Sequence, residues 1–302
     1  MSNLANAHLQ SDHDVAPLLL SAHVLRNDNE ALQAAHALAA VAREHAAKRD
    51  QQRKLPWSQL EAFTQSGLGS ISVPREFGGP QVSYVTLAEV FAIISAADPA
   101  LGQIPQNQVG ILNLIQSTAT HAQKEQLFSS VLQGWRIGNA GPERGSKNTL
   151  DLKARITTDG DEVVINGQKF YSTGALFAHW IAVKALNEDG KQVIAFVRRG
   201  TPGLRVVDDW SGFGQRTTAS GTVLLNDVRV DADLVVDNWR INESPNIQGA
   251  VSQLIQAAID LGIAREAIAD TISFVRERSR PWIDAKVERN SDDPYVIADI
   301  GK

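Results

Sequence analysis

Residues 166–175, NGQKFYSTGA, lie in the part of the chain whose pattern decides the fold. From 136 to 236, short runs of β-forming residues alternate with turn residues, and no helical period interrupts them. The Asn-Gly pair at 166–167 is one such turn signal, because both central residues of a tight hairpin turn must reach positive φ. The other turn signals are Asp159-Gly160, Asp189-Gly190, Pro202-Gly203 and Asn226-Asp227. About six or seven strands without intervening helices predict an antiparallel sandwich or barrel rather than a parallel sheet.

Helical patterns lie on both sides of this β-rich region. Residues 27–134 carry apolar positions at helical spacing, with a capping box at Thr120 and Gln123. Residues 245–279 hold the helical period for about eight turns, which is typical of a helix in a bundle. The fold class is therefore α+β. We expect a flexible N-terminal arm at 1–26, a helical domain at 27–134, a middle β domain at 135–240, and at 241–302 the opening of a helical bundle that the chain leaves incomplete.

Composition excludes several classes of function. Of the 302 residues 43% are hydrophobic, and 29 Lys+Arg against 34 Asp+Glu give a net charge of −5. A chain without basic excess is a poor nucleic-acid binder. The absence of cysteine excludes disulfides, thiol catalysis and iron–sulfur clusters. We expect no membrane association, since no apolar run approaches about 18 residues. No secretory signal is visible, which predicts a cytoplasmic protein.

Common catalytic and cofactor motifs are also missing. The sequence has no G-x-G-x-x-G after a strand, no G-x-S-x-G, and no H-E-x-x-H or EF-hand spacing. We therefore predict neither a Rossmann dinucleotide site nor a hydrolase nucleophile, and no metal site.

The helix–β–helix order and the stretch 166–175 together resemble the acyl-CoA dehydrogenase superfamily of flavoproteins. That stretch is similar to the family's N-G-x-K-x-W-I-T-N-G strand. The resemblance implies that Tyr171 and Thr173 lie against a flavin. This agrees with flavin chemistry, because the ring is a flat apolar plate that stacks on aromatic side chains and its N5 takes a small hydrogen-bonding partner.

A second segment, GNAGPERGS at 138–146, occupies the place of the family's A-x-T-E-P-x-x-G-S-D loop. Its Gly-Asn-Ala start resembles the branch that includes dibenzothiophene monooxygenase and the sulfur-acquisition oxidoreductases. The resemblance implies that Asn139 meets the flavin edge and that Ala140 and Ser146 also contact the cofactor. We expect Asn139, Tyr171 and Thr173 to form the rim of one shared flat slot.

Three further assignments rest on the same resemblance. Residues 210–221 are similar to that branch's W-x-x-x-G-Q-R-x-T-x-S-G, which places Trp210 and Phe213 at the substrate. Arg278 or Arg280, near the end of the long helix, is implied to reach a phosphate of a neighbouring subunit's flavin, a role suited to the planar guanidinium. Gln108 aligns with a residue tied to oxygen chemistry, where an amide can donate a hydrogen bond but cannot act as an acid.

The resemblance implies a flavin-dependent oxidoreductase that uses FMN or FAD. The favoured hypothesis is a reduced-flavin-dependent monooxygenase that acts on a small organosulfur compound in sulfur acquisition. A flavin reductase would be its source of reduced flavin, and the chain would form a homodimer or homotetramer. Two alternatives stay open: an FAD-dependent acyl-CoA dehydrogenase whose catalytic base lies beyond residue 302, and a truncated fragment that cannot turn over.

Overall fold

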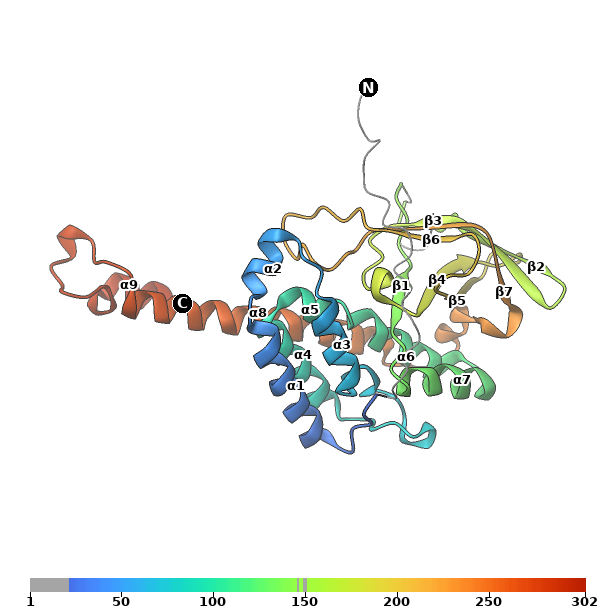
Figure 1. Ribbon diagram of the computed structural model, residues 1–302, viewed down its shortest axis with the longest axis horizontal. Helices are drawn as coiled ribbons and strands as arrows, with labels where there is room; N and C mark the ends of the chain where they lie inside the picture. Colours follow the sequence, from blue (N-terminus) through green and yellow to red (C-terminus); the bar gives the residue numbers. More distant parts are fainter. Residues whose placement is uncertain (1–21, 146, 149–150) are drawn as a thin grey trace, which may run out of the picture.

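The computed structural model describes residues 22–145, 147–148 and 151–302. A body of helices lies against a β domain, and one long helix runs along both (Figure 1). Before the sheet come α1 (Asp28–Arg43), α2 (Ala46–Gln52), α3 (Trp57–Gln65), α4 (Tyr84–Ala97), α5 (Pro99–Gln103), α6 (Gln106–Thr118) and α7 (His121–Leu132). After the sheet come the long α8 (Gln248–Glu277) and the short α9 (Pro294–Ile300). The predicted helix–β–helix order is confirmed.

At several helix starts, the side chain of the capping residue accepts a hydrogen bond from a backbone N–H of the first turn, which otherwise has no partner within the helix. The Asn27 side chain accepts the Glu30 N–H at the start of α1. At the start of α7, Thr120 and Gln123 form the complete reciprocal capping box that the sequence predicts. The segment 22–26, expected to belong to a flexible arm, is packed instead. Leu25 is buried in the helical core and the His23 N–H donates to the Gln65 carbonyl.

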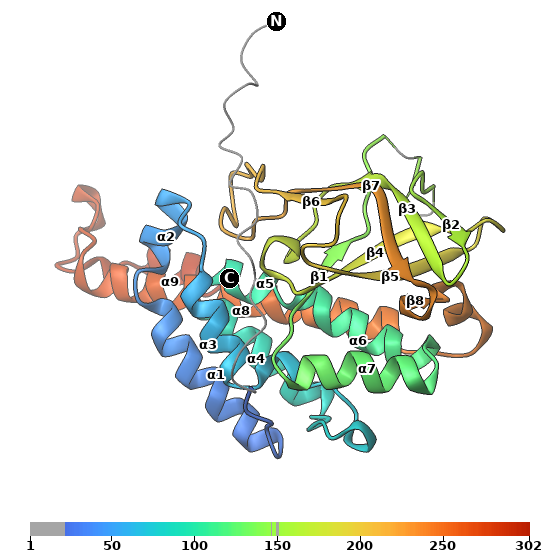
Figure 2. The ribbon, with the colours of Figure 1, turned by 45° about the vertical axis from the view of Figure 1, so that its right-hand side comes forward.

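The β domain is one eight-stranded mixed sheet. Its strands are β1 (Ile137–Ala140), β2 (Arg155–Asp159), β3 (Glu162–Lys169), β4 (Trp180–Leu186), β5 (Gln192–Arg198), β6 (Leu204–Val207), β7 (Thr222–Asp231) and β8 (Val235–Val236). The hydrogen-bonded order is β6-β7-β3-β2-β4-β5-β8, with β1 paired to β4. Most pairs are antiparallel, but β1 and β2 run parallel to β4, which the expectation of a purely antiparallel domain missed. Figure 2 shows β6, β7 and β3 side by side above the helices.

Two of the predicted turn signals are wrong, because they form a bulge between strands. Asn166-Gly167 lies inside β3 and Asn226-Asp227 lies inside β7. The Asn166 side chain donates to the Asp227 carboxylate at 2.9 Å and accepts the Asp227 N–H at 2.9 Å. The pairing register shifts between Ile165 and Gly167. The positive φ that these residue types allow is used at the bulge, where Asp227 has φ +50°.

Helices α4 and α8 pack closely against each other. Val90, Phe91 and Ile94 of α4 pack in one core with Ile255 and Ile259 of α8. The contact is close enough to require glycine at Gly262, where a Cβ would lie 2.2 Å from the Ala92 carbonyl oxygen. The sheet has a separate core, which includes Ile165, Val183 and Val197.

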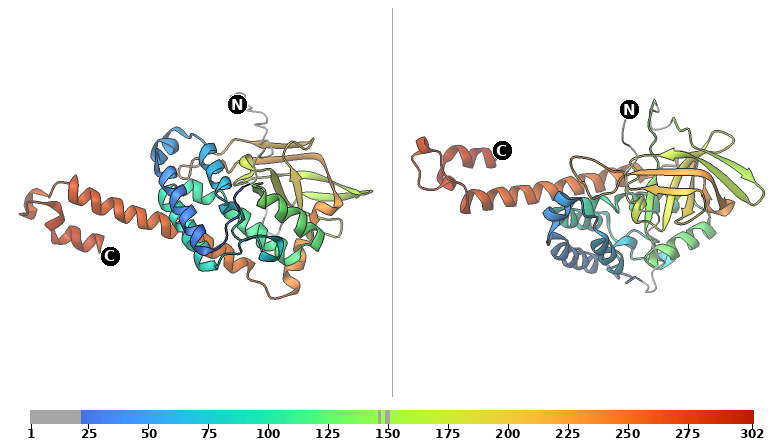
Figure 3. Two further views of the ribbon diagram at one scale, coloured as in Figure 1. Left: turned by 60° about the horizontal axis from the view of Figure 1, so that its bottom comes forward. Right: turned by 45° about the horizontal axis from the view of Figure 1, so that its top comes forward.

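The second half of α8 leaves this body and projects away from the β domain with α9 (Figure 3). Its apolar residues Ile268 and Phe274 are exposed. Within the described ranges, no helix is both long and apolar enough to cross a bilayer.

Candidate active site

The turn after β3 presents the two residues that the sequence placed on a flavin. Tyr171 has φ +53°, a strained conformation for a residue other than glycine. The Thr173 N–H donates to the Tyr171 carbonyl at 2.9 Å, and the Ser172 N–H donates to the Gly221 carbonyl at 3.0 Å. This geometry leaves 52% of Tyr171 exposed while Thr173 stays partly buried. Strained residues held in this way are common where a ligand is clamped.

The end of β1 lies directly against this turn. The Asn139 N–H donates to the Thr173 carbonyl at 3.2 Å, although the two residues are far apart in sequence. Their close approach depends on Gly138, where a Cβ would lie 2.5 Å from the Ala175 Cα. The fold therefore brings the segments of Asn139 and Thr173 together, as the sequence predicts.

A buried ion pair ties the same two segments together a few residues away. Lys169 is fully buried, and its Nζ lies 2.6 Å from a Glu143 carboxylate oxygen and 3.2 Å from the Gly141 carbonyl. Glu143 also accepts the N–H groups of Lys153 at 2.6 Å and Ala154 at 3.0 Å. Burial alone would raise the pKa of Glu143, but Lys169 and the two N–H groups hold that pKa below its ordinary value.

Tyr171 and Trp210 both line a cavity of about 210 Å³. The two rings meet edge to face, with centroids 6.4 Å apart and planes at 79°. Gly212 packs flat on the indole, where a Cβ would come within 2.4 Å. The Arg144 guanidinium lies over the Phe170 ring at 4.3 Å. The remaining lining residues are Asp209, Ser211, Ser220, Gly221 and Thr222.

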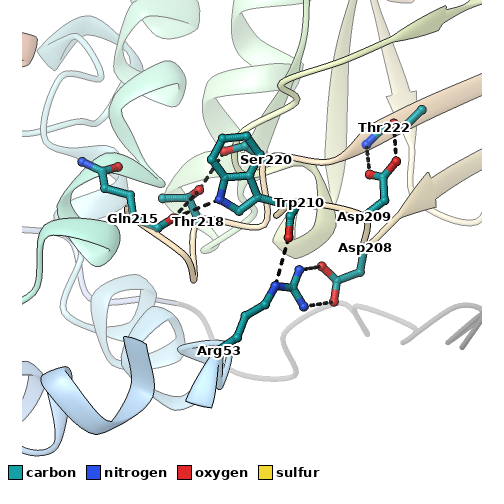
Figure 4. A network of polar contacts seen from close by, with 8 residues as sticks. All are labelled: Arg53, Asp208, Asp209, Trp210, Gln215, Thr218, Ser220 and Thr222. Carbon is teal, nitrogen blue, oxygen red and sulfur yellow. Dashed lines mark hydrogen bonds and ion pairs between the residues drawn. The ribbon is translucent and has the colours of Figure 1, made fainter. Parts of the chain in front are cut away.

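A chain of hydroxyl groups runs from the Trp210 wall to Thr173. The Trp210 Nε1–H and the Thr218 hydroxyl both donate to the Gln215 carbonyl at 3.1 Å. Thr218 Oγ1 lies 2.8 Å from Ser220 Oγ, which lies 2.7 Å from Thr173 Oγ1. Figure 4 shows the part of this chain from Trp210 to Ser220.

The loop that carries Trp210 is fastened to the helical body through α2. Arg53, the residue after α2, holds the Asp208 carboxylate with both terminal nitrogens, and its Nε donates to the Trp210 carbonyl at 3.0 Å (Figure 4). Asp50 accepts the Arg216 N–H at 3.3 Å. Asp209, the next residue, joins the two ends of the loop, because it accepts the N–H and the hydroxyl of Thr222.

Of the three residues expected to form the rim of one slot, only Tyr171 lines the cavity of about 210 Å³, so the expectation of a shared slot is wrong. Thr173 reaches the cavity lining only through Ser220, and Asn139 lines a separate cavity of about 400 Å³ together with Lys184, Glu143 and Leu152. The segment 141–144 separates the two cavities, because Pro142 pairs with Phe170 through a 3.0 Å backbone hydrogen bond. Burial lowers the pKa of Lys184 below its ordinary value.

Gln108 is also not brought to the Tyr171 cavity. It is buried in α6, where its Nε2 donates to the Gly69 carbonyl at 2.7 Å and its Oε1 accepts the Ile137 N–H at 2.9 Å. Both ends of the Gln108 amide thus bind backbone groups, and one of them, the Ile137 N–H, lies two residues before Asn139 in β1. Gln108 acts in this structure as a positioning residue for β1.

The other predicted site residues are placed as follows. Trp210 is a cavity wall, whereas the Phe213 side chain at the tip of the same loop is fully exposed. The Ala140 side chain is buried in the sheet core, which leaves only its backbone for a ligand. Arg278, the C-cap residue of α8, and Arg280, two residues beyond it, are both exposed. Ser146 lies outside the described residues.

Sequence reasoning did not identify the residues that fix the positions of the site segments: Arg53, Glu143, Lys169, Thr218 and Ser220. Glu143, Lys169, Thr218 and Ser220 all belong to quoted motifs, so a signal for them existed. Arg53 gave none, because its partners Asp208 and Trp210 lie more than 150 residues away.

These residues fit a flavin better than a metal. The half-exposed Tyr171 ring and the Trp210 indole offer aromatic surface to a flat apolar ring, and the Thr173 hydroxyl offers a polar contact beside it. Among the residues that the structure describes, no three His, Asp or Glu side chains are grouped so that they could hold a metal ion.

Known proteins share this architecture and much of the sequence. Family models for the acyl-CoA dehydrogenase N-terminal, middle and C-terminal domains match residues 28–135, 138–228 and 254–302. A dibenzothiophene monooxygenase of Rhodococcus erythropolis is 31% identical over 289 residues, covering 91% of this chain and 69% of that protein. A probable FMNH2-dependent monooxygenase, SfnC, of Pseudomonas putida is 26% identical and covers 90% of this chain and 69% of its own length.

Solved structures share the same fold. FMN-bound TdsC from Paenibacillus sp. A11-2 is 29% identical with a TM-score of 0.84, covering 90% of this chain and 71% of that one. Methanesulfinate monooxygenase MsuC from Pseudomonas fluorescens is 25% identical with a TM-score of 0.79, covering 89% of this chain and 70% of that one. The chain belongs to the acyl-CoA dehydrogenase family of flavin-dependent oxidoreductases.

Proposed function

We propose that this protein is a reduced-flavin-dependent monooxygenase that oxidises a small organosulfur compound. The observation that carries the proposal is the cavity lined by Tyr171 and Trp210, beside the hydroxyl chain that ends at Thr173, in a chain 31% identical to a dibenzothiophene monooxygenase. FMN is the proposed cofactor, since TdsC is FMN-bound and SfnC is described as FMNH2-dependent.

The residues around the cavity would have separate roles in binding the flavin. Tyr171 and Trp210 would hold the isoalloxazine by aromatic contact, and Thr173 would bind its polar edge. Reduced flavin, when bound, supplies the electrons that activate molecular oxygen. The loop from Asp208 to Ser220 would restrict water at the reacting centre; Arg53 holds its start, and Asp209 joins its two ends through Thr222.

The partners and location follow from this chemistry. A flavin reductase would supply the reduced cofactor, and the protein would act in the cytoplasm. We propose a homodimer or homotetramer in which Arg278 or Arg280 reaches a flavin phosphate on a neighbouring subunit. The position of both arginines at the end of the projecting α8 supports such a reach (Figure 3).

The dehydrogenase alternative has weaker support. Its base, a carboxylate that removes a proton from the substrate, would lie beyond residue 302, since Asp209, the acidic residue that lines the Tyr171 cavity within the described chain, is bound by Thr222 at 2.8 and 2.7 Å. Butyryl-CoA dehydrogenase from Megasphaera elsdenii shares the fold with a TM-score of 0.81 at only 17% identity.

Two assays on the same preparation separate these functions. Oxygen uptake is measured with NADH, a flavin reductase, FMN and dibenzothiophene, and dye reduction is measured with butyryl-CoA. The proposal expects substrate-dependent oxygen uptake together with a sulfoxide product. Dye reduction by the thioester alone would support the dehydrogenase, and no turnover in either assay would support the catalytically incompetent fragment.

A further inference from the structure

We infer that Arg49 is a positioning residue for the candidate active site. Acting through α2, it determines where the loop that carries Trp210 lies, and so the shape of the cavity that Trp210 and Tyr171 line. The inference concerns contacts within this chain and holds whatever ligand occupies the cavity.

The helix α2 cannot hold its position by itself. It has seven residues, whereas an isolated helix is marginal in water below about 12–15 residues. His45 before it and Arg53 after it both adopt the left-handed conformation, at φ +62° and +50°, which is unfavourable for residues other than glycine. Tertiary contacts must therefore hold α2, and within this helix, which the structure describes throughout, Arg49 is the one buried residue.

Arg49 binds the helical body through directional contacts. Its two terminal nitrogens donate to the Asp98 carboxylate at 2.8 Å, to the Glu44 carbonyl at 2.6 Å and to the Ala42 carbonyl. The Arg49 and Asp98 side chains are each 7% exposed. A planar guanidinium bound at three points fixes the orientation of α2 as well as its distance from the body, which a non-directional apolar contact would not do.

Asp98 is itself held firmly where α4 and α5 meet. Its second carboxylate oxygen accepts the N–H groups of Ala100 and Leu101, both at 3.1 Å, at the start of α5. Its own N–H donates to the Ile94 carbonyl at 2.9 Å, at the end of α4. Arg49 thus joins α2 to a fixed point of the helical body.

Within about one turn of Arg49, α2 holds the loop of the candidate site. Arg53, four residues after Arg49, donates to the Trp210 carbonyl at 3.0 Å (Figure 4). Asp50, the residue next to Arg49, accepts the Arg216 N–H at 3.3 Å. A shift of α2 on the helical body would therefore move both loop contacts together. Buried ion pairs often add little net stability, and the contribution that we assign to this one is a defined position for α2.

Amide hydrogen exchange of residues 209–217 in the full chain measures how often the loop opens, and it needs no flavin. Arg49→Met keeps an apolar stem but loses all three hydrogen bonds, so exchange in the loop should rise by about tenfold or more. Arg49→Lys keeps the charge without the planar fork and should give an intermediate rate. Arg136→Met is the matched control, because Arg136 is also buried but binds Thr64 and the Phe177 carbonyl, outside α2. It should leave exchange in the loop as in the wild type.

A second background separates action through α2 from general destabilisation. Asp50→Ala combined with Arg53→Met removes both contacts from α2 to the loop. If Arg49 acts through α2, adding Arg49→Met to this background should raise the exchange of residues 209–217 no further. A further rise of the same size as in the wild-type background would overturn the inference, as would unchanged exchange in Arg49→Met alone.

Asp98→Asn decides the question if Arg49→Met does not fold. Its amide oxygen can still accept the Ala100 and Leu101 N–H groups, while the charge that binds Arg49 is gone. It should raise exchange in the loop of the otherwise wild-type chain and not in the Asp50→Ala, Arg53→Met background, and the reverse result overturns the inference.

FMN binding then tests the consequence for the site. Where the wild type binds FMN, the dissociation constant should rise in Arg49→Met and Asp98→Asn, and an unchanged constant would overturn the assignment of Arg49 to the site. If the wild type binds no FMN, the proposed function fails, while the exchange measurements still decide whether Arg49 positions the loop.

Discussion

Lys169 and Glu143 form an ion pair 2.6 Å long in the protein interior, with side-chain exposures of 0% and 4%. The pair joins the last residue of β3 to the loop that follows β1. Tyr171 and Thr173 follow directly after Lys169, and Asn139 lies just before Glu143. The spacing of the candidate flavin contacts therefore depends on this buried ion pair.

Breaking this pair should be strongly destabilising. Lys169→Met leaves the Glu143 carboxylate buried without its counter-ion, a change that costs about 3–5 kcal/mol. The exposed Lys153→Met, in the same region, is the control and should change stability by less than about 0.5 kcal/mol. Urea denaturation followed by circular dichroism measures both. A loss below about 1 kcal/mol for Lys169→Met would show that the pair does not hold these segments together.

The same pair predicts a pH dependence. The pKa of Glu143 in the folded protein lies below its ordinary value of 4.5, so its contribution to stability is complete above about pH 4.5 and is lost as the pH falls through the folded-state pKa. Glu143→Gln has no such charge to lose. The stability difference between wild type and Glu143→Gln should therefore be largest near neutral pH and shrink in acid, as measured by denaturation across a pH series. A difference that is constant with pH would contradict the ionised pair.

Arg53 should matter more for the loop than for overall stability. Arg53 and Asp208 are about one-third exposed, so Arg53→Met should cost less than about 1 kcal/mol. It should nevertheless raise amide hydrogen exchange across residues 209–217 and weaken FMN binding, because Trp210 loses its anchor. Arg43→Met removes a comparable ion pair to Glu266, between α1 and α8, and is the control. Equal amide hydrogen exchange across residues 209–217 in the two variants would show that Arg53 does not hold the loop in place.

Gln108 tests the difference between positioning and chemistry. Gln108→Leu leaves the Gly69 carbonyl and the Ile137 N–H buried without partners, which should cost about 1–3 kcal/mol for each group. Turnover per folded molecule should fall no more than the loosening of β1 explains, with KM rising more than kcat falls. The control is Gln106→Leu, which changes the first residue of the same helix. A large kcat loss at unchanged stability would restore the catalytic role inferred from the sequence.

The sequence predicted the larger features and missed the finer ones for identifiable reasons. Local signals such as the Thr120–Gln123 capping box and the long period of α8 depend on neighbouring residues, and the structure confirms them. Asn166-Gly167 is locally identical whether it turns a hairpin or forms a bulge, and only the contact with Asp227 on β7 decides between them.

The arrangement of the candidate site could not be predicted from local motifs. The motifs named Tyr171, Thr173 and Trp210; Tyr171 and Trp210 line one cavity, and Thr173 is linked to it through the Ser220 hydroxyl. The structure places Asn139 beside a second cavity, because the register of β1 on β4 turns its side chain to the sheet face shared with Lys184. Such a register is set by long-range pairing, which no local pattern contains.

The central claim is that the Tyr171 cavity holds the flavin, and a crystal structure of this chain with FMN tests it most directly. The account predicts the isoalloxazine in contact with the Tyr171 ring and the Thr173 hydroxyl, with Trp210 as the facing wall. A flavin seated elsewhere, with the Tyr171 cavity left to solvent, would contradict it.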